Sequence, residues 1–168
     1  KDRKTARPWF DLNCSRSDQK SHRLCTGTTG LVQAWGAMGS RSSVIFDLDD
    51  DGDLDIVSNE FNGEPMIMIS DLAQSDRKLN YLKVKLNGSR SNKSGIGAKV
   101  MVRTADGTLS QNMDGKSGYL SQSLKPLYFG LGDATGVTGI EVHWPSGISQ
   151  TISTPGINTL LEITEPDK

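Results

Sequence analysis

Apolar and polar side chains alternate along most of the chain with the period of a β-strand. Residues 81–86, 99–103 and 140–144 show this most clearly, because every second side chain is apolar and most of the others are charged or polar. Such segments are typical of strands that bury one face. Shorter runs between Gly, Asn, Asp, Pro or Ser clusters predict further strands near residues 43–46, 54–58, 65–69, 108–113, 118–123, 127–131, 148–153 and 159–164. The sequence therefore predicts an all-β protein.

One segment interrupts the alternation and suggests a domain boundary. Residues 71–79 are mostly polar without a strand period, so we expect a linker or a single helical turn there. This division places an N-terminal segment and a repeat in residues 1–72 and a second β domain in residues 78–165. A chain of 168 residues is long enough for one full domain, or for a small domain and a fragment of another.

Charge and hydropathy exclude two classes of partner. A net charge of −1 produces no long-range field that would attract nucleic acid. No apolar run approaches the roughly 18 residues that span a bilayer, so we expect no membrane insertion. The chain begins at Lys1 without an initiator methionine or a signal peptide, and we expect it to be a processed or excised piece of a longer protein.

An acidic segment between two predicted strands has the spacing of a calcium-binding loop. Residues 47–55 follow the pattern D-x-D-x-D-G-x-x-D, and Gly52 at the sixth position permits a sharp turn. Carboxylates about 5 Å apart repel one another by roughly 3 kcal/mol per pair at an effective dielectric near 20, so a compact loop favours a cation. The predicted Ca²⁺ ligands are the carboxylates of Asp47, Asp49, Asp51 and Asp55 and the main-chain carbonyl of Asp53.

Two other interpretations of this loop can be weighed from its neighbours. An EF-hand needs a glutamate at position twelve, where this chain has Ser58, and helices on both sides, where it has strand-like residues. The remaining alternative is a solvated acidic turn without a metal, but such a turn needs no particular order of Asp and Gly.

The two cysteines indicate an oxidising compartment. Cys14 and Cys25 lie close together in a polar, serine-rich stretch, which favours a disulfide; the alternative is two free thiols. Their spacing does not match a zinc site. A disulfide and a calcium loop both suit an extracellular, cell-surface or periplasmic location.

The second half of the chain resembles the ASPIC/UnbV domain. The resemblance rests on five segments in the family's order: Asn80-Tyr-Leu-Lys-Val-Lys-Leu, Ser91-Asn-Lys-Ser-Gly-Ile-Gly-Ala-Lys-Val, Gly118-Tyr-Leu-Ser-Gln-Ser, Tyr128-Phe-Gly-Leu-Gly and Val142-His-Trp-Pro-Ser-Gly. In the first half, Thr29-Gly-Leu, Trp35-Gly and the acidic loop resemble an FG-GAP (VCBS-type) repeat. Residues 1–25 resemble neither.

The resemblance implies a particular architecture and setting. An FG-GAP repeat is one blade of a β-propeller, which needs roughly four to eight blades to close. The second half is implied to be a small antiparallel β-sandwich or barrel. Proteins with both parts, such as those of the cartilage acidic protein family, are secreted or lie at the cell surface. The resemblance implies that this chain is the C-terminal part of one, or that its single repeat packs against the ASPIC/UnbV domain instead.

A second set of residues could bind a ligand. Trp144 ends a predicted strand, where its indole either covers the end of a core or forms a platform for a sugar ring. The cations Lys83, Lys85, Lys99 and Arg103 could form one basic face across two strands and bind an acidic polysaccharide, or they could simply be solvated.

No motif of the chain predicts an active site. Gly95-Ile-Gly-Ala and the glycines after Gly130 lack the helix of a nucleotide loop, and Gly115-Lys-Ser lacks the rest of a P-loop. His22 and His143 have no acid partner that the sequence reveals. We therefore expect a non-enzymatic, calcium-binding extracellular module for adhesion or protein interaction, with a protein or glycan partner. The alternatives are a carbohydrate-binding module and an accessory domain of a secreted hydrolase.

Overall fold

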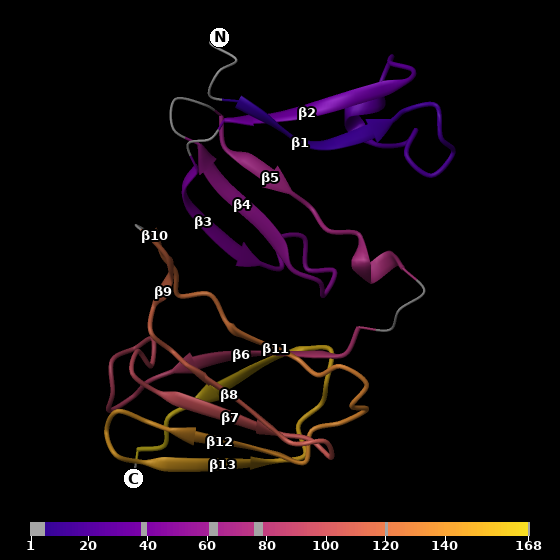
Figure 1. Ribbon diagram of the computed structural model, residues 1–168. Helices are drawn as coiled ribbons and strands as arrows, with labels where there is room; N and C mark the ends of the chain where they lie inside the picture. Colours follow the sequence, from indigo (N-terminus) through magenta and orange to yellow (C-terminus); the bar gives the residue numbers. More distant parts are fainter. Residues whose placement is uncertain (1–5, 38–39, 61–63, 76–78, 120, 168) are drawn as a thin grey trace. The chain divides into compact units, whose positions relative to one another are not determined.

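The computed structural model describes residues 6–37, 40–60, 64–75, 79–119 and 121–167. These residues form strands β1 to β14 joined by turns and short 3₁₀ segments, with no α-helix among them (Figure 1). The predicted all-β class is therefore confirmed.

A hairpin that the sequence did not predict forms the N-terminal part. Strands β1 (Ala6–Asn13) and β2 (Leu31–Ala37) pair antiparallel, and the register shifts between Pro8 and Phe10. The long connection between them contains the 3₁₀ segment η2 (Arg23–Cys25).

The predicted disulfide closes this connection. Cys14 and Cys25 are bonded, with 5.2 Å between their Cα atoms. Both are buried in a small cluster with Leu12 and Val32. A short cross-linked loop of this kind gains about 3 kcal/mol from the reduced freedom of its unfolded chain. The disulfide thus replaces part of the apolar core that the hairpin lacks.

A three-stranded sheet carries the acidic loop. Its strands β3 (Ser40–Phe46), β4 (Asp55–Glu60) and β5 (Met66–Met68) lie in the order β3-β4-β5, and the loop joins the first two. The 3₁₀ segment η3 (Leu72–Gln74) follows, where the sequence predicted a linker or a helical turn.

Two sheets form the C-terminal part. One has the order β11-β6-β14 and is built from Leu127–Gly130, Tyr81–Asn87 and Leu160–Thr164. The other has the order β13-β12-β7-β8 and is built from Ser149–Ser153, Gly139–His143, Lys99–Arg103 and Thr108–Asn112. Two short strands, β9 (Lys116–Gly118) and β10 (Ser121–Gln122), form a separate pair.

The inward side chains of these two sheets make one core. Strand β6 alternates as the sequence predicted, with Leu82, Val84 and Leu86 buried and the lysines between them on the outer face. The neighbouring strands of the same sheet add Phe129 and Ile163. The opposing sheet and the turn after β12 add further buried side chains: Val100, Val102, Ile140, Val142 and Trp144. The expected β-sandwich is thus a pair of packed sheets (Figure 1).

The sandwich differs from the predicted one in two respects. Strand β14 pairs with β6 in parallel, so the sandwich is not wholly antiparallel. The predicted single strand at 118–123 is instead the β9–β10 pair, whose register shifts between Ser121 and Gln122. No Gly, Asn, Asp or Pro follows Gly118 in that stretch, so the sequence carries no strong turn signal inside it.

A buried carboxylate ties the end of the sandwich together. Glu165, which is 2% exposed, accepts hydrogen bonds from the backbone N–H groups of residues 89–91 at 2.7–3.0 Å. The hydroxyls of Ser91 and Ser146 also donate to it. A carboxylate with this many donors can remain ionised in the interior.

The compact units do not divide at residues 71–79. One unit contains the chain up to Arg41 together with Ser58–Met66, and the other contains Ser42–Val57 and Ile67–Lys168. The acidic loop therefore belongs to the same unit as the sandwich, in contrast to the expected division into 1–72 and 78–165. The physical reason lies in the contacts of the loop described below.

Candidate metal centre

The acidic loop turns through two residues with left-handed backbone. Asp50 has φ 61° and Gly52 has φ 100°. Asp tolerates left-handed backbone better than most residues, and Gly adopts it without strain. At Gly52 the absence of a side chain is also needed for packing. A Cβ atom at Gly52 would lie 2.4 Å from Cε1 of Tyr81. The glycine at the sixth position therefore permits both the turn and the close approach of β6.

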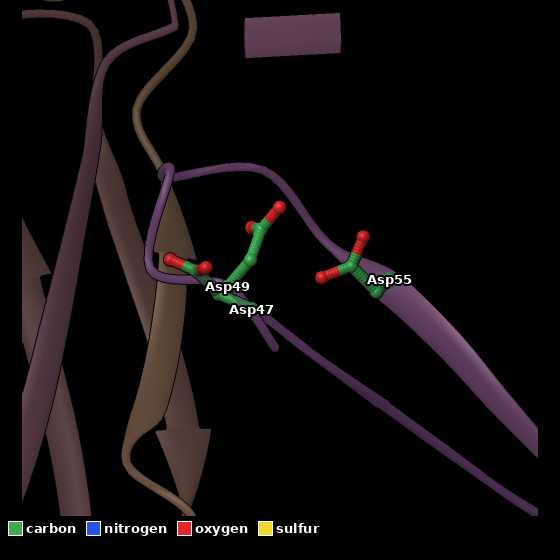
Figure 2. Close-up of side chains that lie close together, drawn as sticks. All are labelled: Asp47, Asp49 and Asp55. Carbon is green, nitrogen blue, oxygen red and sulfur yellow. The ribbon is translucent and has the colours of Figure 1, made fainter. Parts of the chain in front are cut away.

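Three of the predicted ligands lie together. Asp47, Asp49 and Asp55 each offer a carboxylate oxygen, and these three oxygens all lie within 4.8 Å of one another. Figure 2 shows the first two on the loop and Asp55 at the beginning of β4. Oxygen ligands at this spacing suit a hard cation such as Ca²⁺.

The hydrogen bonds of the cluster leave one buried oxygen without a partner. Asp55 is 1% exposed, and its two oxygens accept the N–H groups of Leu48 and Ser70 at 2.7 and 2.8 Å. Oδ2 of Asp47 accepts from Gly52 N at 3.1 Å and from Lys83 Nζ at 3.0 Å. Oδ1 of Asp47 is buried and has no hydrogen-bond partner within the described ranges. Burying a carboxylate oxygen without a partner costs free energy. Oδ1 of Asp47 is therefore suited to bind a cation.

The side chains of the other two predicted ligand residues accept different hydrogen bonds. The Asp51 carboxylate accepts from Asp53 N at 3.0 Å and from Nε2 of Gln74 at 2.7 Å. The Asp53 side chain is 2% exposed and accepts from Ala73 N at 2.8 Å, while its Oδ1 is buried without a partner among the described residues. Asp51 is thus outside the three-carboxylate group, and the Asp53 side chain has a structural contact that the spacing did not indicate.

Side chains of strands β6 and β11 form hydrogen bonds with the acidic loop. Lys83 donates to Asp47 and, at 2.8 Å, to Asp50. The hydroxyl of Tyr128 donates to the carbonyl of Gly52 at 2.7 Å, and its ring stacks on Tyr81 with 5.6 Å between centroids. These contacts explain why the loop belongs to the unit that contains the sandwich. Sequence analysis missed them because they join residues far apart in the chain.

These contacts and the neighbouring charges shift the pKa values of Lys83 and Asp49. Burial by itself would lower the pKa of Lys83, but its hydrogen bonds to Asp50 and Asp47 outweigh that effect and raise this pKa to about 12. Reduced hydration and the neighbouring charge of Asp51 raise the pKa of Asp49. The loop therefore carries negative charge that a single lysine does not fully compensate, and the set of oxygens fits a calcium-type cation.

Trp144 does not form a sugar platform. Its side chain belongs to the core and is 3% exposed, and its indole nitrogen donates to Gln150 at 2.9 Å. The ring face is therefore covered by other side chains. The alternative that it covers the end of a core agrees with the structure.

The four cations singled out in the sequence do not share one face. Lys83 and Lys85 lie on β6, whereas Lys99 and Arg103 lie on β7 in the opposing sheet. Three of them also pair with carboxylates. Lys83 binds the acidic loop, Lys85 contacts Glu162 at 3.0 Å and Arg103 pairs with Glu141. The basic face that the strand pattern suggested is therefore not formed by these four described residues.

The histidines have partners that the sequence did not reveal. His143 Nε2 lies 2.9 Å from Glu141 on the same strand, and its Nδ1 lies 3.3 Å from the Ser149 hydroxyl. Glu141 precedes it by two positions, so strand periodicity places both side chains on one sheet face. Nδ1 of His22 accepts from Leu24 N at 3.2 Å and caps η2.

Residues 88–168 match the family model described as ASPIC and UnbV. The match covers a little under half of the chain. The match begins just after β6, although β6 is the central strand of the sheet that it forms with the matched strands β11 and β14.

Three relatives are similar to a longer part of the chain. Cartilage acidic protein 1 from Mus musculus and from Homo sapiens are each 32% identical over 128 residues, which cover 73% of this chain and 19% of the relative. Cartilage acidic protein 1 from Xenopus tropicalis is 31% identical over 127 residues, with the same coverage. The chain thus spans about a fifth of the length of these relatives. Among the residues whose structure is described, no helix is long and apolar enough to cross a membrane.

Proposed function

We propose that the chain is a calcium-binding, non-enzymatic module for protein interaction within a larger extracellular or cell-surface protein. The observation that carries the metal part is the buried, unpartnered Oδ1 of Asp47 beside the carboxylates of Asp49 and Asp55. Three carboxylates with a buried free oxygen leave a negative charge that the protein alone does not neutralise. The disulfide suits the oxidising environment outside the cell.

The similarity to proteins named for cartilage supports the setting. Cartilage is a tissue rich in extracellular matrix, and the similarity covers 73% of this chain. We propose that strands β3, β4 and β5 with their acidic loop are an FG-GAP blade. A cation there would be held by Asp47, Asp49 and Asp55, with Asp51 and the Asp53 carbonyl joining after rearrangement of the loop. Its positive charge would offset their mutual repulsion and fix the loop against β6.

Thermal unfolding with calcium or with a chelator tests the metal centre. We expect a dissociation constant on the order of 10⁻⁴ to 10⁻³ M, as in other extracellular calcium modules. At a calcium concentration one hundred times that constant, the free energy of unfolding should rise by about 2.7 kcal/mol. Mg²⁺ should act less well, because it requires a smaller and more rigid coordination sphere.

Two isosteric variants make the test specific. Asp49→Asn removes charge from the three-carboxylate group and should abolish most of the calcium-dependent gain in melting temperature. Asp50→Asn changes a neighbouring, exposed carboxylate outside that group and should retain most of the gain. Equal responses of the two variants, or a wild-type melting curve that calcium does not change, would show that the loop is only a solvated acidic turn.

A further inference from the structure

A groove lies beside the acidic loop, within the unit formed by Ser42–Val57 and Ile67–Lys168. It has a volume of about 660 Å³, which is in the range of about 300–1,000 Å³ typical of ligand sites. Its walls come from residues 44–48, from residues 111–116 at the end of β8, and from residues 123–128 at the start of β11. Asp50, Leu54, Lys83 and Leu160 complete it.

Aliphatic side chains form much of the groove. Ile45 is 59% exposed, and Leu48, Leu54 and Leu160 are 38–43% exposed. Large apolar side chains gathered in a hollow, with this much surface in solvent, are typical of a surface that another molecule covers. Aliphatic walls suit apolar side chains better than sugar rings, which stack on flat aromatic faces. Two aromatic side chains line the groove and both have partners: Lys125 Nζ lies 4.2 Å from the centre of the Phe46 ring, and the Tyr128 ring stacks on Tyr81.

The groove is lined by three lysines and three acids, and two of its lysines are outside the ion pairs. Of its three lysines, Lys83 is already paired with Asp47 and Asp50. Lys116 and Lys125 have no carboxylate within ion-pair distance in the described part of the chain. Asp114, the remaining acid of the groove, accepts the backbone N–H of Lys116 at 2.9 Å. The two unpaired ammonium groups would attract carboxylates of a ligand.

One wall of the groove is an edge strand. Strand β3 ends the order β3-β4-β5, and Val44, Ile45 and Phe46 of this strand line the groove. An edge strand can add an extended peptide, which then places alternate side chains into neighbouring pockets. Apolar walls, two lysines without ion pairs among the described residues and an edge strand together match a peptide that alternates apolar and acidic side chains.

We propose that this groove binds an extended segment of a partner protein, in which apolar side chains alternate with Asp or Glu. The apolar side chains would pack on Ile45, Leu48 and Leu160, and the carboxylates would pair with Lys116 and Lys125. This inference rests on the proposed function, since it names the class of partner that the interaction module takes.

Fluorescence anisotropy with short labelled peptides tests the proposal at saturating calcium. The probes alternate leucine with glutamate, with lysine or with glutamine. We expect the glutamate peptide to bind at least about tenfold more tightly than the lysine peptide. Lys125→Glu and Lys116→Glu should each weaken its binding severalfold, while Lys99→Glu, on β7 outside the groove, should not. Equal binding of the three peptides, no saturable binding, or equal effects of all three variants would overturn the proposal.

Two further measurements test whether the peptide binds in the groove, and the calcium experiment distinguishes failure of the groove proposal from failure of the metal centre. Methyl chemical shifts of Ile45, Leu48 and Leu160 should move when the glutamate peptide is added, and shifts confined to other regions would contradict the groove. A sulfated oligosaccharide that binds there in preference to the peptide would also contradict it. If the calcium-dependent gain in stability is present but the peptide does not bind, the groove proposal alone is wrong. If the peptide binds and calcium has no effect on stability, the metal centre alone is wrong.

Discussion

The ammonium nitrogen of Lys83 lies 3.0 Å from Oδ2 of Asp47, and this ion pair joins strand β6 to the first position of the acidic loop. The side chain of Asp47 is 2% exposed and that of Lys83 is 14% exposed, so water screens the pair little. The same carboxylate therefore binds the sandwich through one oxygen and offers its other oxygen to a cation.

Replacing Lys83 with Met should separate these two roles. Without the ammonium group Asp47 is buried and unpaired, so the free energy of unfolding without calcium should fall by about 3 kcal/mol. Calcium should restore part of the loss, because it neutralises the same carboxylate, and the calcium-dependent gain should exceed that of the wild type. Chemical denaturation with and without calcium measures both values.

The matched control is Lys85→Met. Its partner Glu162 is 52% exposed, and such a surface pair contributes about 1 kcal/mol or less. The calcium-dependent gain of this variant should equal that of the wild type. A Lys83→Met protein that no longer responds to calcium would instead show that the lysine is needed to form the metal centre.

Gly52→Ala should destabilise the loop by about 1–3 kcal/mol. Alanine is strained at φ 100°, and its Cβ would overlap the Tyr81 ring. Adding Tyr81→Ala should relieve the overlap but not the backbone strain, so a double-mutant cycle gives each contribution. Gly136→Ala is the control, because a Cβ atom there would meet no other atom within 4 Å and the φ of Gly136 is not in the left-handed region. Equal unfolding free energies for both alanine variants would contradict the close approach of β6.

Glu165 should make the stability depend on acid pH. Burial would raise its pKa, but hydrogen bonds from Ser146, Ser91 and Arg90 outweigh that effect and lower the pKa to about 2 from the usual 4.5. The folded-state pKa is thus below the unfolded one, so the contribution is complete above about pH 4.5 and is lost as the pH falls toward about 2. Urea unfolding across this range should show a steeper loss for the wild type than for Glu165→Gln. Glu162→Gln, at an exposed position, should resemble the wild type more closely.

The sandwich should fold without the N-terminal hairpin. All buried members of its core lie between Leu82 and Ile163. A protein that begins at Leu79 should therefore unfold cooperatively, but at a lower temperature than one that begins at Ser42 and retains the acidic loop. Thermal melts and the dispersion of amide signals in NMR spectra compare the two. An unfolded or aggregated shorter protein would show that the loop is an integral part of the sandwich.

The sequence predicted those elements whose signal is local. Strands β6, β7 and β12 were predicted because alternation survives wherever one face of a sheet is buried. The three-carboxylate group was predicted because the loop brings Asp47, Asp49 and Asp55 together over nine consecutive positions.

The remainder depends on contacts between distant residues. Lys83 has the same alternating environment in sequence as Lys85, and only the fold shows that one binds a buried carboxylate and the other an exposed one. Trp144 is equally ambiguous, since an indole at a strand end either covers a core or forms a binding surface. The hairpin of β1 and β2 was missed because its stability comes from a disulfide and a small cluster rather than from a continuous apolar face.

The parallel pairing of β14 with β6 sets the order in which the sandwich can be completed during synthesis. The contact between Lys85 and Glu162 spans 77 positions, and the backbone N–H of Glu165 continues the ladder by donating to Asn87 at 2.9 Å. On the ribosome, β6 emerges before both of its neighbours, so its two hydrogen-bonding edges stay open until β11 and then β14 are made. Such a nascent strand is exposed to pairing with other chains, so chaperones and the rate of translation should influence the yield of this protein more than its final stability does.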